Sequence, residues 1–298
     1  PEELVYYLEH RQDYSIFVHD SSNGCATGSC LEEAIFHGLL ELIERDAFLL
    51  TWYARLSPPR IDPRSCCRAE TLFVLENIER HGYELTLLDT RLDIRVPSVV
   101  SVVKRKEPGP GNIMLAAGAG LNPEDAVRSA LSEVACYVRN LRMNLEDNLD
   151  EVRGMARDFS KITQVIHHGV LYGLPEMAHH IEFLLQNPTI RTLEETYRDW
   201  VAIRPVNRDL RDDLNYCLKM VLDLGLDVIV VDQTCSELAS SGLKAVSVIV
   251  PGLLPIDFGW KRERVFNLPR LRTVPRTAGF SATDFSPDPL NVAPHPFP

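Results

Sequence analysis

The chain has 298 residues, of which 45% are hydrophobic and 24% are charged, and this composition is typical of a globular protein of one or two domains. Its formal net charge of −11 argues against bulk binding to nucleic acid, which depends on the neutralisation of phosphates by Lys and Arg. No signal peptide and no apolar run long enough to span a bilayer are present, and the seven cysteines form no C-x-x-C pair, so we expect a cytoplasmic protein with reduced thiols and no membrane partner.

The first predicted elements are a strand at Tyr14 to Val18 and, after a loop of small residues, a long helix. Ser29 and Glu32 have the spacing of a capping box, which predicts that this helix begins there and continues to about Leu50. Five apolar side chains fall within one arc of about 100° and predict its core face. These are Ile35, Leu39, Leu42, Ile43 and Leu50.

The opposite face of this helix is acidic. It carries Glu33, Glu41 and Glu44, with His37 between them and Arg45 beside them. Such a face is consistent with a solvated surface, but also with a Mg²⁺ site, because magnesium binds through a few carboxylates together with substrate phosphates. The loop before the helix would suit a phosphate, since backbone N–H groups at a helix N-terminus point at anions.

A related motif recurs 92 positions later. Between the two motifs, the sequence predicts a helix from Ala69 to His81, strands at Glu84 to Thr90 and Val96 to Lys104, and a hairpin turn to Asn112. The offset aligns Gly28 with Gly120 and Glu41 with Glu133, so a second glycine loop and a helix at Glu124 to Val138 are expected.

This repeat predicts an α+β fold of mixed sheets with packed helices, built on two related strand–loop–helix units that face each other. The second copy has Cys136 and Tyr137 where the first has Glu44 and Arg45. Two interpretations therefore stay open for its helix, one as a packing element and one in which Glu133 belongs to the site.

The remaining elements are weaker predictions. His167 and His168 are adjacent and do not share a face, which favours core or substrate-contact roles over metal binding. The other expected elements are a helix at Glu176 to Leu185, a polar connection at Leu193 to Val206, an amphipathic helix at Asp209 to Leu224, a buried strand at Leu226 to Thr234, a polar turn at Ser236 to Ser241, and a strand and turn at Gly242 to Ile256.

The run from Ser21 to Phe48, SSNGCATGSCLEEAIFHGLLELIERDAF, resembles the central motif of the YcaO family, ATP-dependent enzymes that activate backbone amides in ribosomally made peptides. The W-x-x-R-x-x-P-P-x-I-D pattern from Trp52 to Asp62 is similar to the azoline-forming, SagD-type branch. The resemblance covers residues 1–298 as the later part of the family's domain, because the family's upstream E-x-x-E-R motif has no counterpart before Asn23.

This resemblance implies a set of site residues. Glu33, Glu41 and Glu44 would bind Mg²⁺–ATP, with Arg45 near the phosphates, Ser29 in the preceding loop and Glu133 as a further nucleotide contact. The chain ends in P-x-P-x-P, which alone is consistent with a mobile polyproline II tail. In azoline-forming members this terminus is an ordered strut, so the resemblance implies that the Pro298 carboxylate accepts a proton near Arg45.

The implied function is ATP-dependent cyclodehydration of Cys, Ser or Thr residues in a precursor peptide, which gives thiazoline or oxazoline rings. The alternatives are a thioamide- or amidine-forming YcaO enzyme and a non-catalytic scaffold that binds a peptide or a partner protein. The implied partners are the precursor peptide, a leader-binding E1-like or ThiF-like protein or fused domain, an azoline dehydrogenase and a second copy of the chain.

Overall fold

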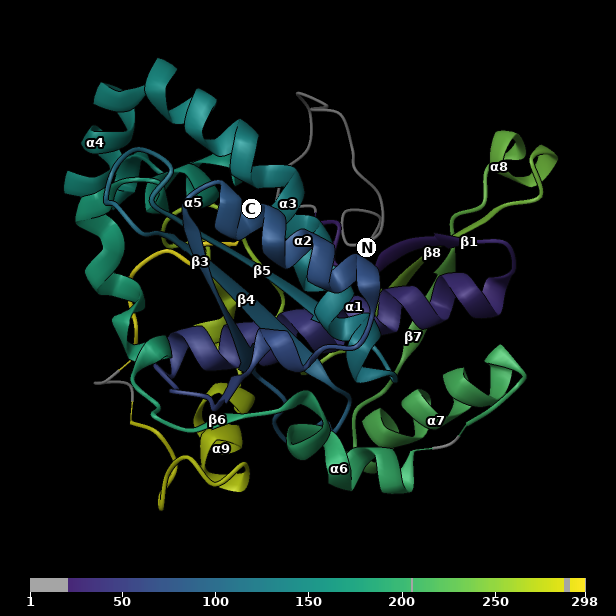
Figure 1. Ribbon diagram of the computed structural model, residues 1–298. Coiled ribbons are helices and arrows are strands. Elements are labelled where there is room, and N and C mark those ends of the chain that lie inside the picture. Colours follow the sequence, from purple (N-terminus) through teal and green to yellow (C-terminus); the bar gives the residue numbers. More distant parts are fainter. Residues whose placement is uncertain (1–20, 205, 287–289, 298) are drawn as a thin grey trace, which may run out of the picture.

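The computed structural model describes residues 21–204, 206–286 and 290–297, with the side chains of 138–144 and 146 excluded. Two separate sheets and a set of packed helices make up this part of the chain, so the predicted α+β class is confirmed (Figure 1). The predicted strand at Tyr14 to Val18 lies outside the described residues.

The larger sheet has five strands in the order β5-β4-β3-β2-β6. Its pairs are antiparallel except β2 with β6, so the sheet is mixed as predicted. Every residue of β4 from Ser98 to Val103 is buried, as expected for a strand covered on both faces. The strands are β2 (Arg60–Ile61), β3 (Tyr83–Asp89), β4 (Ser98–Arg105), β5 (Ile113–Ala119) and β6 (Ile190–Arg191).

The smaller sheet is antiparallel, with the order β1-β8-β7. It consists of β1 (Cys25–Gly28), β7 (Ile229–Asp232) and β8 (Lys244–Ile249). The prediction of a buried strand at Leu226 to Thr234 is wrong, because β7 is an edge strand whose residues Ile229 and Val230 are exposed. Ser236–Ser240 forms a short helix, α8, in place of the predicted polar turn.

Helix α1 (Leu31–Tyr53) connects the two sheets. Its first half packs on β1 and β8, and further along it contacts β4 and β5 of the larger sheet (Figure 1). The predicted core residues Leu39, Leu42, Ile43 and Leu50 are buried, whereas Ile35 is only partly so. From Asp46 onward every residue of the helix is buried, so its acidic face ends at Glu44.

The predicted capping box at Ser29 and Glu32 is wrong by one residue. The N-cap is Cys30, which places Glu33 at the third helical position. The Glu33 carboxylate accepts hydrogen bonds from both the backbone N–H and the hydroxyl of Ser29, at 2.6 and 2.7 Å. Glu33, rather than Glu32, therefore makes the hydrogen bonds back to the residue before the helix, and these bonds fix the loop that precedes α1.

The second unit consists of β5 and α3 (Pro123–Asp147), a helix nine residues longer than predicted at its C-terminal end. The two units make equivalent close approaches. A Cβ on Gly28 would meet Glu33 and Ala34, and a Cβ on Gly120 would meet Asp125 and Ala126, which are the same positions under the 92-residue offset. In each unit the glycine lets the loop lie against the first turn of its helix.

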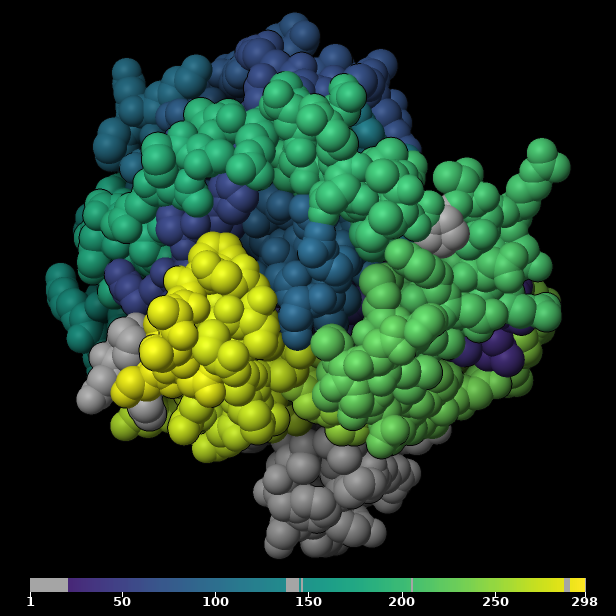
Figure 2. Space-filling view, turned by 90° about the horizontal axis from the view of Figure 1, so that it is seen from below, coloured from purple at the N-terminus to yellow at the C-terminus, as the bar shows by residue number. Residues whose placement is uncertain are grey.

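The other helices surround this frame. The stretch Pro175–Leu185 is a 3₁₀ helix where an α-helix was predicted, and the ring nitrogen of His179 contacts the Glu176 carbonyl that an α-helix would use. The stretch predicted as a polar connection forms α6 (Leu193–Ile203), because Thr192 and Glu195 make a capping box. The remaining α-helices are α2 (Ala69–Arg80), α4 (Leu149–Arg157), α5 (Val165–Tyr172), α7 (Leu210–Asp223) and α9 (Arg270–Thr277). Seen from below, α6 and α7 (green) border the C-terminal segment (yellow) across a hollow (Figure 2).

Candidate functional site

The Arg45 guanidinium is held on two sides in the acidic stretch of α1. One nitrogen donates to the Asn23 side-chain oxygen at 2.7 Å, and another pairs with Glu41 at 2.9 Å. The Arg45 side chain is 13% exposed, so the cation is fixed with little access to water. A planar guanidinium can donate to two acceptors at once, so Asn23 and Glu41 together fix the orientation of the Arg45 side chain.

The loop before α1 is tied to the same group. Glu41 accepts the backbone N–H of Gly24 at 2.7 Å, and Asn23 donates to the carbonyl of Ile256 at 2.9 Å. The sequence analysis missed Asn23, although the S-N-G pattern contained it. The Asn23 side chain bridges the Arg45 cation of α1 and the chain that follows β8, because its oxygen also accepts the backbone N–H of Ile256 at 3.3 Å.

Glu44 and Glu133 form the second part of the site, one from each unit. Burial, and after it the nearby charge of Glu133, raise the pKa of Glu44 to about 8, against the opposing effect of Arg45. Burial likewise raises the pKa of Glu133 to about 7, with Arg45 opposing. These two carboxyls therefore share a poorly hydrated space in which a cation would be strongly stabilised.

The three predicted metal ligands have different partners in this structure. Glu33 binds Ser29 and Glu41 binds Gly24 and Arg45, while, after burial, the charges of Glu133 and Glu41 both raise the pKa of Glu44, and that of Glu41 also raises the pKa of Glu133. Within residues 21–204, 206–286 and 290–297 there is no cluster of three or more His, Cys, Asp or Glu side chains arranged for a metal ion. The donor chemistry still fits Mg²⁺, which commonly takes one or two protein carboxylates and completes its shell with phosphate oxygens and water.

A buried ion network fixes the part of α1 next to Arg45. Arg270 of α9 donates to both carboxylate oxygens of Asp46 and to both of Asp93. Asp46 also accepts the backbone N–H of Leu254 at 2.8 Å. Charged groups this deep are tolerated because each is paired, and the network locks α1 against α9 and the β3–β4 connection.

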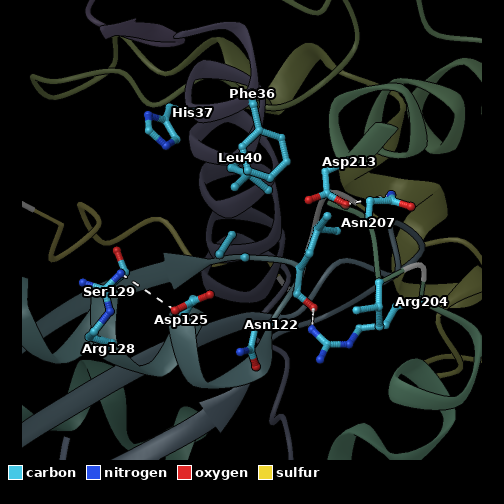
Figure 3. Close-up of a pocket in the computed structure, with 14 residues that line it drawn as sticks. Phe36, His37, Leu40, Asn122, Asp125, Arg128, Ser129, Arg204, Asn207 and Asp213 are labelled. Carbon is cyan, nitrogen blue, oxygen red and sulfur yellow. Dashed lines mark hydrogen bonds and ion pairs between the residues drawn. The ribbon is translucent and has the colours of Figure 1, made fainter. Parts of the chain in front are cut away.

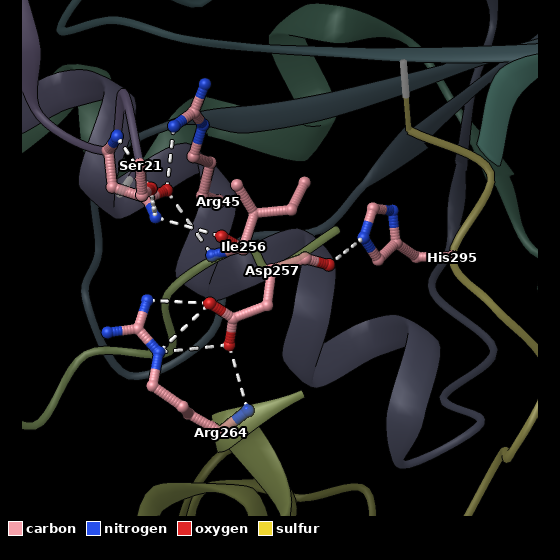
Figure 4. Close-up of polar contacts among 7 residues, drawn as sticks. Ser21, Arg45, Ile256, Asp257, Arg264 and His295 are labelled. Atoms are coloured by element: carbon pink, nitrogen blue, oxygen red, sulfur yellow. Dashed lines mark hydrogen bonds and ion pairs between the residues drawn. The ribbon is translucent and has the colours of Figure 1, made fainter. Parts of the chain in front are cut away.

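The C-terminal segment packs against the far half of α1. The rings of His295 and His168 stack with centroids 4.2 Å apart, and the His295 ring bonds the carbonyl of Asp257 at 3.0 Å (Figure 4). The Phe297 ring lies 4.8 Å from that of Phe48. His168 is therefore a core residue, and the tail is packed up to Phe297. Pro298, the predicted proton acceptor, lies outside the described residues.

A family model described as "YcaO cyclodehydratase, ATP-ad Mg2+-binding" matches residues 1–254. The chain therefore belongs to the YcaO family.

Solved structures and curated relatives resemble the chain over different lengths. A heterocyclase in complex with substrate and cofactor is 28% identical with a TM-score of 0.76, and the match covers 100% of this chain and 36% of that one. The heterocyclase TruD is 30% identical with a TM-score of 0.70, covering 100% of this chain and 37% of that one. YcaO from Methanopyrus kandleri, bound with AMPPCP and Mg²⁺, is 25% identical with a TM-score of 0.58, covering 81% and 57%.

Among curated sequences, an uncharacterized protein of Methanothermobacter thermautotrophicus is 32% identical over 235 residues, which is 78% of this chain and 55% of that protein. An uncharacterized protein in the tfuA 3′ region of Rhizobium leguminosarum bv. trifolii is 34% identical over 165 residues, which is 51% and 36%. The chain thus spans about half or less of the length of these relatives. No helix among the described residues is both long and apolar enough to cross a membrane.

Proposed function

We propose that this chain carries the ATP- and Mg²⁺-dependent activity of an azoline-forming cyclodehydratase. The observation that carries the proposal is the junction of the two units, where the fixed Arg45 cation lies beside the Glu44 and Glu133 carboxyls. The family description and the heterocyclase relatives support the class of reaction.

In this reaction the side chain of a substrate Cys, Ser or Thr attacks the carbon of the preceding amide. The amide oxygen then takes the γ-phosphoryl of ATP and leaves as phosphate, so that one ring, one ADP and one phosphate form. The oxygen that is lost as water in the net reaction departs within the phosphate. The protein supplies positioning and stabilisation of charge, as in other phosphoryl transfers.

The residues of the site would divide this work. Glu44 and Glu133 would hold Mg²⁺, which when bound neutralises phosphate charge. Arg45 would direct its cation at the phosphates, while Glu41 and Asn23 keep its plane fixed. The Ser29–Glu33 pair would shape the loop that precedes α1. A catalytic role for the Pro298 carboxylate stays a prediction.

We extend the proposal to the partners. The substrate would be a precursor peptide, recognised through a leader-binding E1-like or ThiF-like protein or domain, and the ring could pass to an azoline dehydrogenase. A homodimer and a cytoplasmic location complete the proposal.

The test is an assay of the chain with a candidate precursor peptide, ATP and Mg²⁺, read by peptide mass and by phosphate release. We expect loss of one water and formation of one phosphate per ring. A peptide mass change that corresponds to exchange of one oxygen for one sulfur would indicate thioamidation instead of azoline formation. Phosphate release without any change of peptide mass would contradict both reactions.

The matched variants are Glu41→Gln and Glu76→Gln, the second on the exposed face of α2 where Glu76 pairs with Arg80. Glu41→Gln should abolish ring formation with the fold intact, and Glu76→Gln should retain it. Wild-type turnover in Glu41→Gln would refute the proposed role of Glu41 in holding Arg45.

A further inference from the structure

The acidic stretch of α1 is bordered by open space at one end and by the C-terminal segment at the other. The open space is a cavity of about 440 Å³, which Phe36 and Leu40 help to line (Figure 3). Every described residue that lines it belongs to α1, to the chain from β5 into α3, or to the stretch from Arg204 to Asp213. The C-terminal segment therefore leaves this approach open, and any influence it has on the site passes through the protein interior.

The C-terminal segment follows one side of α1. Trp52 donates its indole N–H to the carbonyl of Ala293 at 3.0 Å, and the rings of Phe48 and Phe297 lie 4.8 Å apart. On the helix, Trp52, Phe48 and Arg45 fall within an arc of about 60°. The segment therefore runs along α1 in the direction from Trp52 toward Arg45.

Buried side chains hold the main chain of this segment. Three consecutive carbonyls, those of Ala293, Pro294 and His295, accept hydrogen bonds from Trp52, Tyr172 and His168 in turn. All three donor residues are fully buried. Proline has no N–H and a restricted backbone, so carbonyls are the main-chain groups that a proline-rich segment offers for binding. The backbone of the segment is therefore fixed in position as well as its side chains.

Two imidazoles connect this segment to the chain that follows β8. His295 donates from Nε2 to the carbonyl of Asp257 at 3.0 Å. His168 donates from Nδ1 to the carbonyl of His295 at 3.0 Å and accepts the Gly259 N–H at Nε2, at 2.9 Å. Burial lowers the pKa of His168 to about 4, and burial, then His168, lower the pKa of His295 well below its ordinary value. Both rings are therefore neutral, and their partners fix one tautomer of each.

The chain that follows β8 is also bonded to the loop before α1. Asn23 donates its amide N–H to the carbonyl of Ile256 at 2.9 Å and accepts the Ile256 N–H at 3.3 Å. The same Asn23 oxygen accepts from Arg45 at 2.7 Å. Ser21 binds the Asn23 amide too, but it belongs to the same loop. Ile256 therefore orients the Asn23 amide, and with it the Arg45 cation, relative to the chain beyond β8.

We propose that His295 is a positioning residue for Arg45. It acts through Asp257 and its neighbour Ile256, which lie between His295 and Arg45 in Figure 4. A bound C-terminal segment would keep the guanidinium in its orientation, and loss of the His295 hydrogen bond would loosen it. The effect on turnover rests on the proposed function, which places Arg45 at the phosphates. The connection itself can be tested without turnover.

The first test measures hydrogen exchange at the Ile256 backbone N–H by NMR in the whole chain, because this N–H is bonded to Asn23. His295→Leu removes the donor and keeps an apolar core residue, whereas His295→Gln places an amide N–H near the position of Nε2. We expect exchange to be about tenfold faster in His295→Leu and within about threefold of the unmodified chain in His295→Gln. His81→Leu, at an exposed position after α2, should leave it unchanged.

Exchange at the buried Leu115 of β5 reports overall unfolding in the same spectra. An increase at Leu115 as large as that at Ile256 would show general destabilisation and overturn the inference. Unchanged exchange at Ile256 in His295→Leu would also overturn it.

The second test is kinetic. His295→Leu should lower kcat for ring formation about tenfold, with the KM of the peptide within about twofold, and His295→Gln should restore kcat. Added to Asn23→Ala, His295→Leu should lower kcat by less than about twofold further, because both act on one connection. Full multiplication of the two losses would contradict this. Faster Ile256 exchange with recovery in His295→Gln, in a chain that never cyclises a peptide, would refute the proposed function and leave the connection standing.

Discussion

Glu44 of α1 and Glu133 of α3 lie close enough for their charges to interact across the junction of the two units, although they are 89 positions apart in the sequence. Each residue is partly buried, and the charge of Glu133 raises the pKa of Glu44. Two like groups held in poor solvation are unfavourable unless they share a proton or a cation. Holding the Glu44 and Glu133 carboxyls near each other is therefore electrostatically unfavourable, and a bound cation would reduce this cost.

The first prediction concerns stability and pH. The folded-state pKa of Glu44 is raised from its ordinary value near 4.5 to about 8, so the folded chain binds the proton more tightly than the unfolded chain does. The contribution of Glu44 to the free energy of unfolding is therefore fully present below about pH 4.5, and it is lost as the pH rises toward 8. Glu44→Gln removes this dependence and should raise the free energy of unfolding at pH 8 by on the order of 1–3 kcal/mol.

Chemical denaturation between pH 5 and pH 8 measures this effect. Glu76→Gln is the control, because Glu76 is exposed and should leave the slope with pH unchanged. Parallel pH curves for the unmodified chain and Glu44→Gln would show that the carboxyl is not perturbed.

The second prediction concerns Arg45. Lysine keeps the charge but is a point cation on a flexible stem, so Arg45→Lys cannot bind Asn23 and Glu41 together. We expect kcat for ring formation to fall by about 10²-fold, with little change in the KM of the peptide. Arg80→Lys, which alters a surface pair with Glu76, should leave kcat unchanged. Equal kcat values for Arg45→Lys and the unmodified chain would count against a role at the phosphates.

The third prediction concerns the C-terminal segment. Phe297 is 4% exposed and lies against Phe48, so Phe297→Ala should lower the free energy of unfolding by about 2–4 kcal/mol. Phe280 is 38% exposed, and Phe280→Ala should cost no more than about 0.5 kcal/mol. Denaturation in urea provides both values. A loss for Phe297→Ala as small as that of the control would mean that the tail does not hold this packing in solution.

The fourth prediction concerns close packing of α1 on β8 and on the residue before β1. A Cβ on Gly38 would lie 2.6 Å from the Gly24 carbonyl oxygen and 2.9 Å from a methyl of Val248. Although alanine favours a helix by about 1 kcal/mol, Gly38→Ala should destabilise the chain by about 1–3 kcal/mol because the backbone must shift. Gly154→Ala in α4 meets only Lys161 at 3.6 Å and should be neutral or stabilising. The same sign for both substitutions would contradict the contact.

Much of this fold could be predicted because local patterns and tertiary packing agree. The periodicity around Leu39 and Ile43 gave α1, and the glycine repeat gave the second unit. The errors arose where a local signal was shifted or overlooked. Cys30 rather than Ser29 caps α1, and the Thr192–Glu195 capping box was not recognised as the start of α6.

Only the part of the site that lies on α1 could be predicted from the sequence. The helical positions of Glu41, Glu44 and Arg45 follow from a single periodicity, but their partners do not. The pairing of Glu44 with Glu133 depends on how the two sheets are placed, and the clamp on Arg45 depends on Asn23 and on a carbonyl over 200 positions away. Burial then determines the protonation of Glu44 and Glu133, and this burial cannot be read from a sequence pattern.

The most direct test of the central claim is calorimetric titration of AMPPCP–Mg²⁺ at pH 7 in buffers with different ionisation enthalpies. If Glu44 and Glu133 hold the metal, binding must drive off the protons that their raised pKa values retain. We expect release of about one proton by the unmodified chain and clearly less by Glu44→Gln. Equal proton release by the two proteins, with equal affinity for the nucleotide, would contradict it.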